Sequence, residues 1–320
     1  MAFSKISVII PVYKAEKYME KACRSLFSQT FGDVEYIFID DASPDRSIEL
    51  MRQVLGDFPH RKNQVRVISH PSNAGVGRSR QDGVDRAEGK FIIHFDPDDW
   101  AEPNWLEALY DAAVDKNADI VYCDFYEETA SEAQRIEQPY ERDKKALFHE
   151  IAFENLHGAL WNKLIASSLA KSVRIQPGVN LWEDLSIVPY MMMAARKIVK
   201  VNRALYHYNL TNLDSLSQWN GSANAMSCIL ALDSLLDIMK RDGLLRLVDA
   251  RDLFRLQWSA KKGLILDPSE ENLNIWNEKY HESNNHISGM GLPLRFKIIS
   301  YLAKHKNLTL LKFYQSLKNK

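Results

Sequence analysis

The chain has 320 residues, of which 46% are hydrophobic and 26% are charged, a composition typical of globular proteins. Its 41 Lys and Arg residues nearly balance its 42 Asp and Glu residues, and the net charge of −1 argues against bulk nucleic-acid binding. Three widely spaced cysteines, Cys23, Cys123 and Cys228, suit neither a disulfide framework nor a metal-ligand spacing. With no secretory signal and no apolar run of bilayer length, we expect a cytoplasmic protein, soluble or peripheral to the membrane.

Short apolar runs alternate with segments of helical spacing in the first part of the chain. Strands are expected at residues 6–12, 34–39, 65–68, 91–95 and 119–123, and helices at 15–28, 44–56, 74–87 and 103–116. This alternation predicts a parallel, doubly wound α/β sheet. Ligands of such sheets bind beyond the carboxyl ends of the strands, and two acidic clusters, at 40–41 and 96–99, follow strands of this chain.

The remaining elements are expected in a mixed order. Residues 129–141 are interpreted as a loop, and a helix at 145–156, a short strand at 161–165 and a helix at 183–195 follow. A strand pair is expected at 197–201 and 204–208, and from residue 222 the pattern is helical, with breaks near 263–269 and 283–293. These patterns predict an α/β domain over residues 1–215 and a helical region over residues 216–320.

The acidic segment after the fourth expected strand suggests a metal site. In an extended chain residues i and i+2 point the same way, so Asp96 and Asp98 can converge on one divalent cation. Oxygen ligands with open positions suit Mg²⁺ or Mn²⁺ bound to a diphosphate. The alternative is an acidic turn that caps the helix beginning near Pro103.

Two further segments allow a functional and a structural interpretation. A carboxylate of the Asp40-Asp41 pair can accept hydrogen bonds from a base or a ribose, but Asp, Ser and Pro are also ordinary turn residues. Residues 73–80 contain two glycines but lack the third of a dinucleotide motif. Either their backbone approaches a phosphate or base, with Arg80 reaching an anion, or they form a glycine-relaxed helix start with solvated arginines.

Glu183 and Asp184 also have two interpretations. In the first turn of a helix they would complement the helix dipole, which the residues alone favour, whereas the functional alternative makes one of them a general base. The histidines form no metal-binding motif. His94, inside a strand, is expected to be packed, and His207 is more often structural than a metal ligand.

Taken together, these segments resemble family 2 glycosyltransferases with the GT-A fold, a Rossmann-like nucleotide-diphospho-sugar transferase fold. The resemblance is carried, in the family's order and spacing, by residues 7–13 with Glu16, 28–30, 35–45, 73–75 with Arg80 and Gly83, 89–92 leading to 96–99, 161–164, and Glu183-Asp184. It leaves the last hundred residues or so uncovered. The chain departs from the family pattern at Lys14, Gln81 and Asn209, where Asn, Asn and Arg are common.

The resemblance implies a metal-dependent, inverting glycosyltransferase of the hexosyltransferase type, acting in polysaccharide or cell-envelope biosynthesis. It would move a sugar from a nucleotide-diphosphate sugar, in particular a UDP-sugar, to a glycan or lipid-linked acceptor, with Mn²⁺ or Mg²⁺ as cofactor. Carried over residue by residue, the resemblance implies that the nucleotide base is lined by Pro11, Val12, Tyr13 and Glu16, and that Asp40 binds a uracil-type base with Asp41 adjacent. It implies that Arg80 approaches the base or diphosphate and that Asp96 contacts the ribose or donor sugar. It also implies that Asp98 ligates the metal and that Asp184 is the general base.

Two other classes remain open at this point. A haloacid-dehalogenase-like phosphatase also uses Asp-x-Asp after an apolar strand, but it wants a threonine shortly after the second Asp, and here Asp98 is followed by Asp99-Trp100-Ala101. A non-catalytic nucleotide-sugar-binding protein is the other alternative, and the intact acidic positions count against it.

The C-terminal tail has an unusual charge. No acidic residue follows Glu282, and residues 294–320 contain seven Lys or Arg, with apolar residues at helical spacing. A basic amphipathic helix can lie in the headgroup plane of an anionic membrane, which would give peripheral contact at its inner face through residues 294–320. The alternative is a helix that packs on the catalytic domain and leaves its basic face in solvent.

Overall fold

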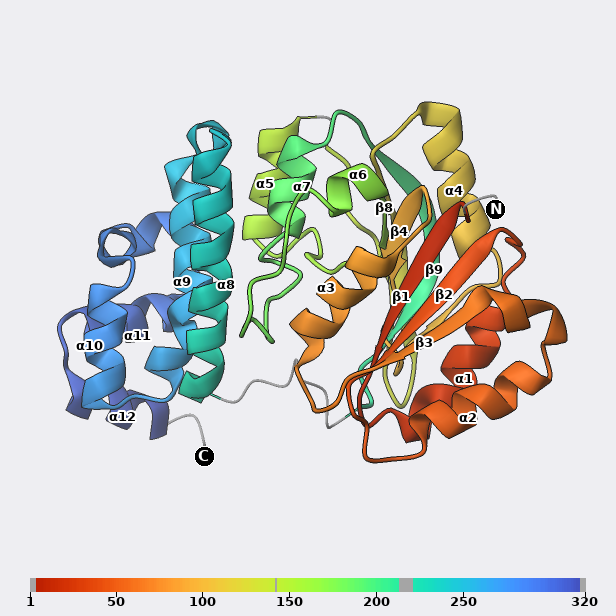
Figure 1. The fold of residues 1–320 in the computed structure, drawn as a ribbon. Helices are drawn as coiled ribbons and strands as arrows, with labels where there is room; N and C mark the ends of the chain where they lie inside the picture. Colours follow the sequence, from red (N-terminus) through yellow and green to blue (C-terminus); the bar gives the residue numbers. More distant parts are fainter. Residues whose placement is uncertain (1–3, 142, 213–220, 317–320) are drawn as a thin grey trace.

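The computed structural model describes residues 4–141, 143–212 and 221–316 (Figure 1). The strands are β1 (Ile6–Val12), β2 (Val34–Asp40), β3 (Val65–Ser69), β4 (Phe91–His94), β5 (Trp100–Ala101), β6 (Ile120–Glu128), β7 (Ala133–Ile136), β8 (Lys163–Ala166) and β9 (Ile198–Asn209). The α-helices are α1 (Glu16–Phe27), α2 (Ser47–Gly56), α3 (Val76–Arg86), α4 (Trp105–Lys116), α5 (Lys144–Ala152), α6 (Ser167–Ala170), α7 (Val188–Ala194), α8 (Gly221–Arg241), α9 (Ala250–Leu266), α10 (Glu270–Glu278), α11 (Leu294–Lys304) and α12 (Leu308–Ser316). Short 3-10 helices lie at Pro59–Gln64, Leu245–Leu247, His281–Asn285 and Ile287–Met290.

The strands form one sheet in the order β3-β2-β1-β4-β8-β6-β9-β5, with β7 paired to β6. Strands β1 to β4 are parallel, as are β6 and β9, but β8 runs antiparallel between β4 and β6. The prediction of an α/β fold is confirmed, and the predicted parallel arrangement holds for β1 to β4 but is broken by the antiparallel β8. The chain reaches β8 through the β7 hairpin and α5 without the right-handed crossover that a parallel strand requires.

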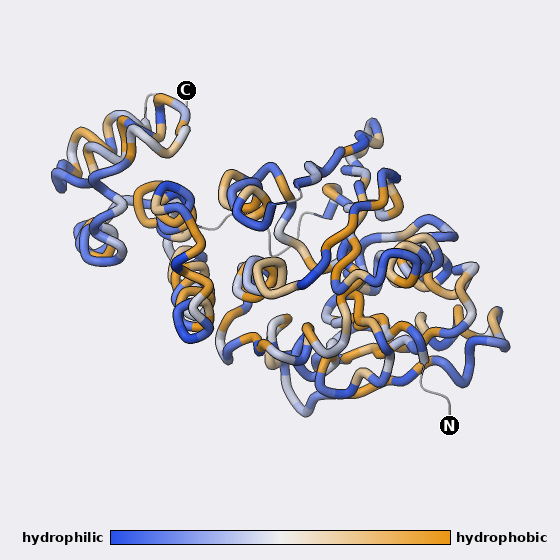
Figure 2. The backbone as a smooth tube through the Cα atoms, turned by 90° about the horizontal axis from the view of Figure 1, so that it is seen from above, coloured by the Kyte–Doolittle hydropathy of each residue, from blue (hydrophilic) through white to orange (hydrophobic). Residues whose placement is uncertain are grey.

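Helices cover both faces of the sheet (Figure 1). Helices α1, α2 and α4 share one hydrophobic cluster with alternate residues of the strands, including Val8 and Ile10. Helices α3, α5 and α7 cover the other face, to which Ile9 points. Because both faces are buried, β1 is apolar along nearly its whole length, and the hydrophobic residues gather along the strands (Figure 2).

The C-terminal helices α8 to α12 lie beyond α5 and α7, at the end of the molecule remote from β1 to β3 (Figure 1). Their apolar residues, including Leu232 and Trp258, continue the hydrophobic cluster of the second sheet face. The expected boundary between residues 215 and 216 lies in the segment 213–220, outside the described residues. Among the described helices, none is both long and apolar enough to cross a bilayer. The three cysteines are buried and form no disulfide.

Three local predictions are wrong. Residues 133–136, expected in a loop, form β7, an almost fully exposed edge strand without an apolar alternation to reveal it. The expected strand pair at 197–208 is one strand, β9, which absorbs the polar Asn202-Arg203 interruption in a register shift against β6. Helix α7 begins at Val188, with Pro189 in its first turn, so Glu183 and Asp184 precede it instead of capping it.

Candidate active site

The acidic turn at 96–99 lies at the carboxyl edge of the sheet, directly after β4. Asp99 is buried, and its two carboxylate oxygens accept hydrogen bonds from the Tyr206 hydroxyl and the Asn209 backbone N–H, both at 2.8 Å. Burial and the neighbouring carboxylates of Asp98 and Asp96 raise the pKa of Asp99 well above its usual range. Asp99 therefore anchors the turn to β9. The other two carboxylates of the turn, those of Asp96 and Asp98, contact different partners.

Asp98 lies next to the end of β9. Its Oδ2 accepts a hydrogen bond from Asn212 Nδ2 at 2.7 Å, and its backbone carbonyl accepts one from Asn209 Nδ2 at 3.0 Å. Burial and the charge of Asp96 raise the pKa of Asp98. Asp98 also lines a pocket of about 360 Å³, whose other lining residues are Lys17, Tyr18, Lys21, Trp100, Glu128, Thr129, Asn209 and Thr211.

Asp96 accepts its side-chain hydrogen bond from a different partner, Arg80. Arg80 Nη2 lies 2.9 Å from Asp96 Oδ1, and Arg80 Nε lies 3.1 Å from Glu183 Oε1 and 3.4 Å from Asp184 Oδ1. The arginine side chain is only 4% exposed. Burial acts to lower the pKa of Arg80, but the three carboxylates outweigh burial and raise it well above its usual value. Helix α3 thus supplies one buried cation to carboxylates from two distant segments.

Glu183 and Asp184 reach this cation from the turn before α7. Burial and the charge of Asp184 raise the pKa of Glu183 to about 7, and burial also raises that of Asp184, against the opposing effect of Arg80. Asp184 Oδ2 accepts the Leu160 backbone N–H at 3.0 Å, while its buried Oδ1 has no hydrogen-bond partner among the described residues. Trp182, just before the pair, has a φ of +64°, a conformation that side chains rarely adopt outside functional sites and tight turns.

A buried lysine holds the turn that carries Leu160. Lys163 Nζ donates to the backbone oxygens of His157 and Ala159, at 2.6 and 2.8 Å, and to Asn162 Oδ1 at 2.8 Å. Burial lowers the pKa of Lys163 to about 7, although the charge of Asp184 opposes the shift. Lys163 therefore holds the turn whose Leu160 N–H donates to Asp184.

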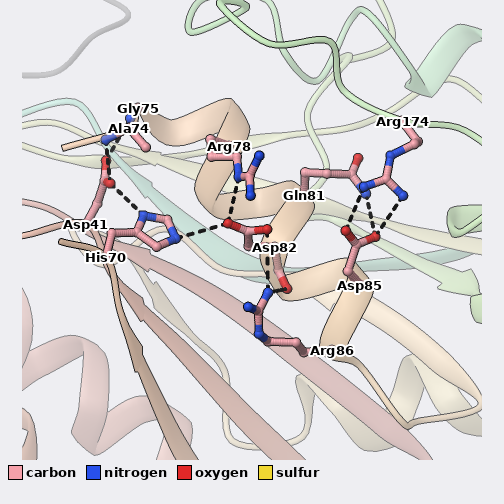
Figure 3. Close-up of polar contacts among 10 residues, drawn as sticks. All are labelled: Asp41, His70, Ala74, Gly75, Arg78, Gln81, Asp82, Asp85, Arg86 and Arg174. Atoms are coloured by element: carbon pink, nitrogen blue, oxygen red, sulfur yellow. Dashed lines mark hydrogen bonds and ion pairs between the residues drawn. The ribbon is translucent and has the colours of Figure 1, made fainter. Parts of the chain in front are cut away.

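The second acidic cluster follows β2. Asp40 accepts hydrogen bonds from the Ser43 backbone N–H at 3.0 Å and the Ser69 hydroxyl at 3.2 Å, which is ordinary turn chemistry. Asp41 is buried and accepts the backbone N–H groups of Ala74 and Gly75 at 2.7 and 2.8 Å (Figure 3). The Asp41 carboxylate thus joins the loop after β2 to the loop before α3.

The residues expected around the base surround the end of β1. Pro11 and Val12 are buried, whereas the Tyr13 side chain is 43% exposed. Glu16 Oε2 accepts the Arg46 backbone N–H at 3.0 Å, which joins α1 to the start of α2. Only Tyr13 of this set therefore presents a large free surface at the edge of the sheet.

The fold brings together residues that the sequence placed far apart. Asp96, Arg80 and Asp184 form one cluster, Asp98 is next to it in the same turn, and Asp40 ends a strand of the same edge. His94 is packed in β4, as expected, and the His207 ring nitrogens lie 2.7 Å from Glu128 and 3.0 Å from Glu102. Among the described residues, no group of three or more His, Cys, Asp or Glu side chains is arranged to hold a metal.

Sequence reasoning did not single out the partners that position these groups. They are Tyr206 and Asn212 beside the acidic turn, the Leu160 N–H and Lys163 beside Asp184, and His70 beside Asp41. Lys163 lies in a segment that carried the family resemblance, which is the one signal that pointed to it. The others have no local pattern that marks them.

The sequence matches the family described as glycosyl transferase family 2 over residues 7–172. The chain therefore belongs to family 2 of the glycosyltransferases, and the phosphatase alternative is discarded. It is 28% identical to the glycosyltransferase GlyA of Streptococcus pneumoniae over 64% of this chain and 30% of that protein. It is 30% identical to the putative glycosyltransferase EpsH of Bacillus subtilis over 67% of this chain and 62% of that protein. The chain thus spans about a third and three fifths, respectively, of the length of these relatives.

Solved structures support the GT-A fold. The crystal structure of S. aureus TarS residues 1–349 in complex with UDP-GlcNAc superposes with a TM-score of 0.71, covering 98% of this chain and 91% of that chain at 17% identity. A mannosyltransferase from Pyrobaculum calidifontis, in complex with GDP-Man and Mn²⁺, superposes with a TM-score of 0.54 over all of this chain and 85% of that one, at 13% identity. The chain thus combines a family 2 glycosyltransferase domain of GT-A fold with a helical C-terminal region.

Proposed function

We propose that this glycosyltransferase moves a sugar from a UDP-sugar, with inversion, to a glycan or lipid-linked acceptor. The observation that carries the proposal is the cluster in which Asp96 and Asp184, from opposite parts of the chain, flank the buried Arg80 at the carboxyl edge of the sheet. That edge is where open α/β sheets bind nucleotides. The TarS neighbour, which was crystallised with UDP-GlcNAc, supports the choice of a UDP-sugar.

In this proposal Asp184 is the general base. A base must be ionised before it removes the proton of the acceptor hydroxyl, and it works best when its pKa is not too low. Arg80 and the Leu160 N–H favour the carboxylate of Asp184, whereas burial raises its pKa and so its basicity. Asp184 Oδ1 accepts no hydrogen bond among the described residues, although it lies 3.4 Å from Arg80 Nε, and it is the atom we assign to the acceptor proton.

The donor is held by the remaining acidic groups and the two loops. In this proposal Asp40 accepts hydrogen bonds from the nucleotide base. Tyr13 packs beside the base, and Pro11, Val12 and Glu16 line the same end of β1. Asp96 contacts the ribose or donor sugar. Arg80 neutralises Asp96, so that Asp96 can lie close to the anionic diphosphate. Asp41 serves the site by holding residues 74 and 75.

Asp98 is assigned to Mn²⁺ or Mg²⁺. Mg²⁺ is commonly bound through one or two carboxylates together with substrate phosphates, so a ready-made cage of three protein ligands is not required. Asp98 fits, because it is a carboxylate whose pKa is raised by burial and by the charge of Asp96, a repulsion that a cation offsets. When bound, the cation would stabilise the negative charge on the leaving diphosphate.

The tail offers a second surface, for a membrane that carries the acceptor. Leu294, Tyr301 and Phe313 are the most exposed large hydrophobic residues of the described chain, at 72%, 61% and 60%. Leu294 and Tyr301 are seven residues apart on one face of α11, flanked by Lys297 and Lys304. Other tail residues, namely Ile299, Ala303 and Leu311, pack in the core.

One face of the tail is thus part of the fold, but α11 packs mainly on the other C-terminal helices, α9, α10 and α12, and not on the catalytic domain as the packing alternative expected. We propose that the outward face contacts anionic lipid, which its cations attract and its apolar side chains enter. Lys318 and Lys320 of the expected basic segment lie outside the described residues. The chain is 28% identical to a cholesterol galactosyltransferase of Borreliella burgdorferi, over 75% of this chain and 69% of that protein. The name of this relative supports a lipid as one class of acceptor.

A donor screen tests the central proposal. Thermal unfolding of the protein with UDP, GDP and ADP, each with Mn²⁺, should show the largest stabilisation with UDP, because a ligand that binds only the folded state raises its stability. Release of UDP from a panel of UDP-sugars then identifies the donor. Binding of UDP without turnover of any UDP-sugar, across glycan and lipid-linked acceptors, would leave only a nucleotide-sugar-binding role.

A further inference from the structure

His70 lies between two carboxylates that belong to different elements (Figure 3). Its Nδ1 is 2.8 Å from Asp41 Oδ1, in the loop after β2, and its Nε2 is 3.1 Å from Asp82 Oδ2, in α3. The three side chains are between 4% and 10% exposed. Both ring nitrogens therefore face acceptors and are shielded from bulk water.

The two contacts need a donor at each ring nitrogen. An ionised carboxylate only accepts hydrogen bonds, and a neutral imidazole has a single N–H to donate. The Asp41 carboxylate already accepts two backbone N–H groups, those of Ala74 and Gly75. Burial acts to raise the pKa of Asp82, but the hydrogen bond and charge of Arg78 and the charge of Arg86 lower it overall. With both partners ionised, the two contacts are satisfied together only by an imidazolium with both N–H groups.

The bridge joins three segments of the nucleotide site. The Asp41 carboxylate holds the N–H groups of Ala74 and Gly75, which come directly before α3, the helix that carries Arg80. The His70 backbone N–H donates to the Asp40 carbonyl at 2.8 Å. The ring thus links Asp41 to α3, and through Asp41 it is connected to the loop before that helix.

The charged groups around the ring come from each element packed against it. Asp41 and Asp40 lie in or beside the loop after β2, and the Asp40 carboxylate is turned toward Ser43 and Ser69. Asp82 faces the ring from α3, where Arg78 Nε, at 2.7 Å, and Arg86 Nη1, at 3.5 Å, share its carboxylate. If the ring loses a proton, one ring nitrogen turns a lone pair toward a carboxylate, and that side of the bridge opens.

We propose that the protonated His70 is a positioning residue of the nucleotide site, which holds the loops at 40–43 and 73–75 in the arrangement that receives a nucleoside diphosphate. The inference rests on the proposed function for its ligand, but the positioning itself concerns only this chain. Because both contacts need a ring N–H, the bridge contributes to affinity where the ring is an imidazolium and contributes less where it is a neutral imidazole.

A His70→Gln variant tests the proposal through the affinity for UDP, measured by calorimetry with Mg²⁺ at pH 6 and at pH 9. A glutamine amide can donate to one carboxylate but must turn its oxygen toward the other. At pH 6 we expect the variant to bind UDP roughly tenfold more weakly than the wild type, the scale of one hydrogen bond to a charged group. At pH 9 the two affinities should converge. The ratio of the two UDP affinities at each pH is compared, because the effects of titrating groups that both proteins contain are then removed.

Asp82→Asn provides the reverse test. Its amide N–H can donate to the unprotonated Nε2, so a neutral ring spans the bridge, and this variant should bind UDP more tightly than the wild type at pH 9. His149→Gln is the matched control, because it removes a histidine–carboxylate contact of the same 2.8 Å length, to Asp252 near α5 and α9. It should leave the UDP affinity unchanged at both pH values.

Hydrogen exchange of the peptide covering residues 73–78 separates this inference from the proposed function. At pH 6, without nucleotide, the wild type should protect this peptide and the folded His70→Gln variant should not. Equal protection, or an affinity ratio that does not change with pH, would overturn the positioning role. If the wild type bound no nucleoside diphosphate, the proposed function would fail, and the exchange result would still decide the role of His70.

Discussion

Leu160 donates its backbone N–H to Asp184 Oδ2 at 3.0 Å, from a turn that the buried Lys163 holds by three hydrogen bonds. A second buried lysine, Lys261 in α9, plays a similar part at the far end of the molecule, where it donates to the carbonyls of Trp276, Lys279 and Tyr280 and to Asn284 Oδ1. Burial lowers the pKa of each lysine to about 7. The two lysines therefore form a matched pair that differs in distance from the proposed base.

Lys163→Met should both destabilise the protein and impair transfer. We expect a loss of about 2–3 kcal/mol in the free energy of unfolding, because buried acceptors lose their donor, and roughly a tenfold lower kcat per folded molecule, because the Asp184 carboxylate is less well oriented. Lys261→Met should cost similar stability in urea unfolding and leave kcat unchanged. Equal effects of the two variants on kcat would show that Lys163 matters only for folding.

Asp184→Asn should retain UDP-sugar affinity and lower transfer by about two to four orders of magnitude, the range for loss of a general base. The amide can still accept the Leu160 N–H, so the turn is kept while the proton acceptor is lost. Single-turnover transfer and donor binding should be measured on the same preparation. Near-normal turnover would show that Asp184 is not the general base and that Glu183 and Asp184 serve only as structural partners of Arg80.

Asp98→Ala should remove the dependence of UDP binding on a divalent cation. In the wild type, UDP should bind better with Mn²⁺ or Mg²⁺ than in a chelator, because a cation held by Asp98 would offset the negative charge of the diphosphate. Calorimetric titrations of both proteins with and without Mn²⁺ measure the difference. Equal affinity of wild-type protein in chelator would contradict the metal role of Asp98.

Glu183 should make stability depend on pH. Its pKa is raised from 4.5 to about 7 in the folded protein, first by burial and then by Asp184. Between these values the folded state binds more protons than the unfolded state, so the contribution of Glu183 to the free energy of unfolding falls as pH rises from 4.5 to about 7. Urea unfolding across this range should show a slope that Glu183→Gln reduces, while the other buried carboxylates with a raised pKa, including Asp99 and Asp184, retain the rest. Glu270→Gln, an exposed glutamate of α10, should retain the slope.

The outward face of the tail should bind anionic vesicles in a salt-sensitive way. Because Ile299, Ala303 and Leu311 are buried, deleting residues 294–320 would damage the core, and substitutions on the exposed face are the sharper test. Leu294→Ser with Tyr301→Ser, or Lys297→Glu with Lys304→Glu, should weaken co-sedimentation with phosphatidylserine vesicles at low salt. Val114→Ser, an exposed apolar residue of α4, is the control. No vesicle binding by the folded wild type at low salt would make the tail purely structural.

Much of the scaffold could be predicted from local pattern. Apolar runs such as residues 6–12 and 34–39 identified the buried parallel strands, and the rule that parallel strands end at one edge placed Asp40 and Asp96 on the same side of the sheet. The order of the acidic and glycine segments also indicated the family, which the comparison confirmed. These features depend on periodicity and on residue type, which a sequence displays directly.

Other features depended on which distant segments pack together. The antiparallel insertion of β8, the exposed edge strand β7 and the single strand β9 follow from the chain path and from strand partners rather than from their own residues. Arg80 looked equally like a solvated helix residue and an anion-binding one until the fold surrounded it with Asp96, Glu183 and Asp184. Burial and the pairing of charges across about a hundred residues decide such roles, because both arise only when the helices close over the sheet.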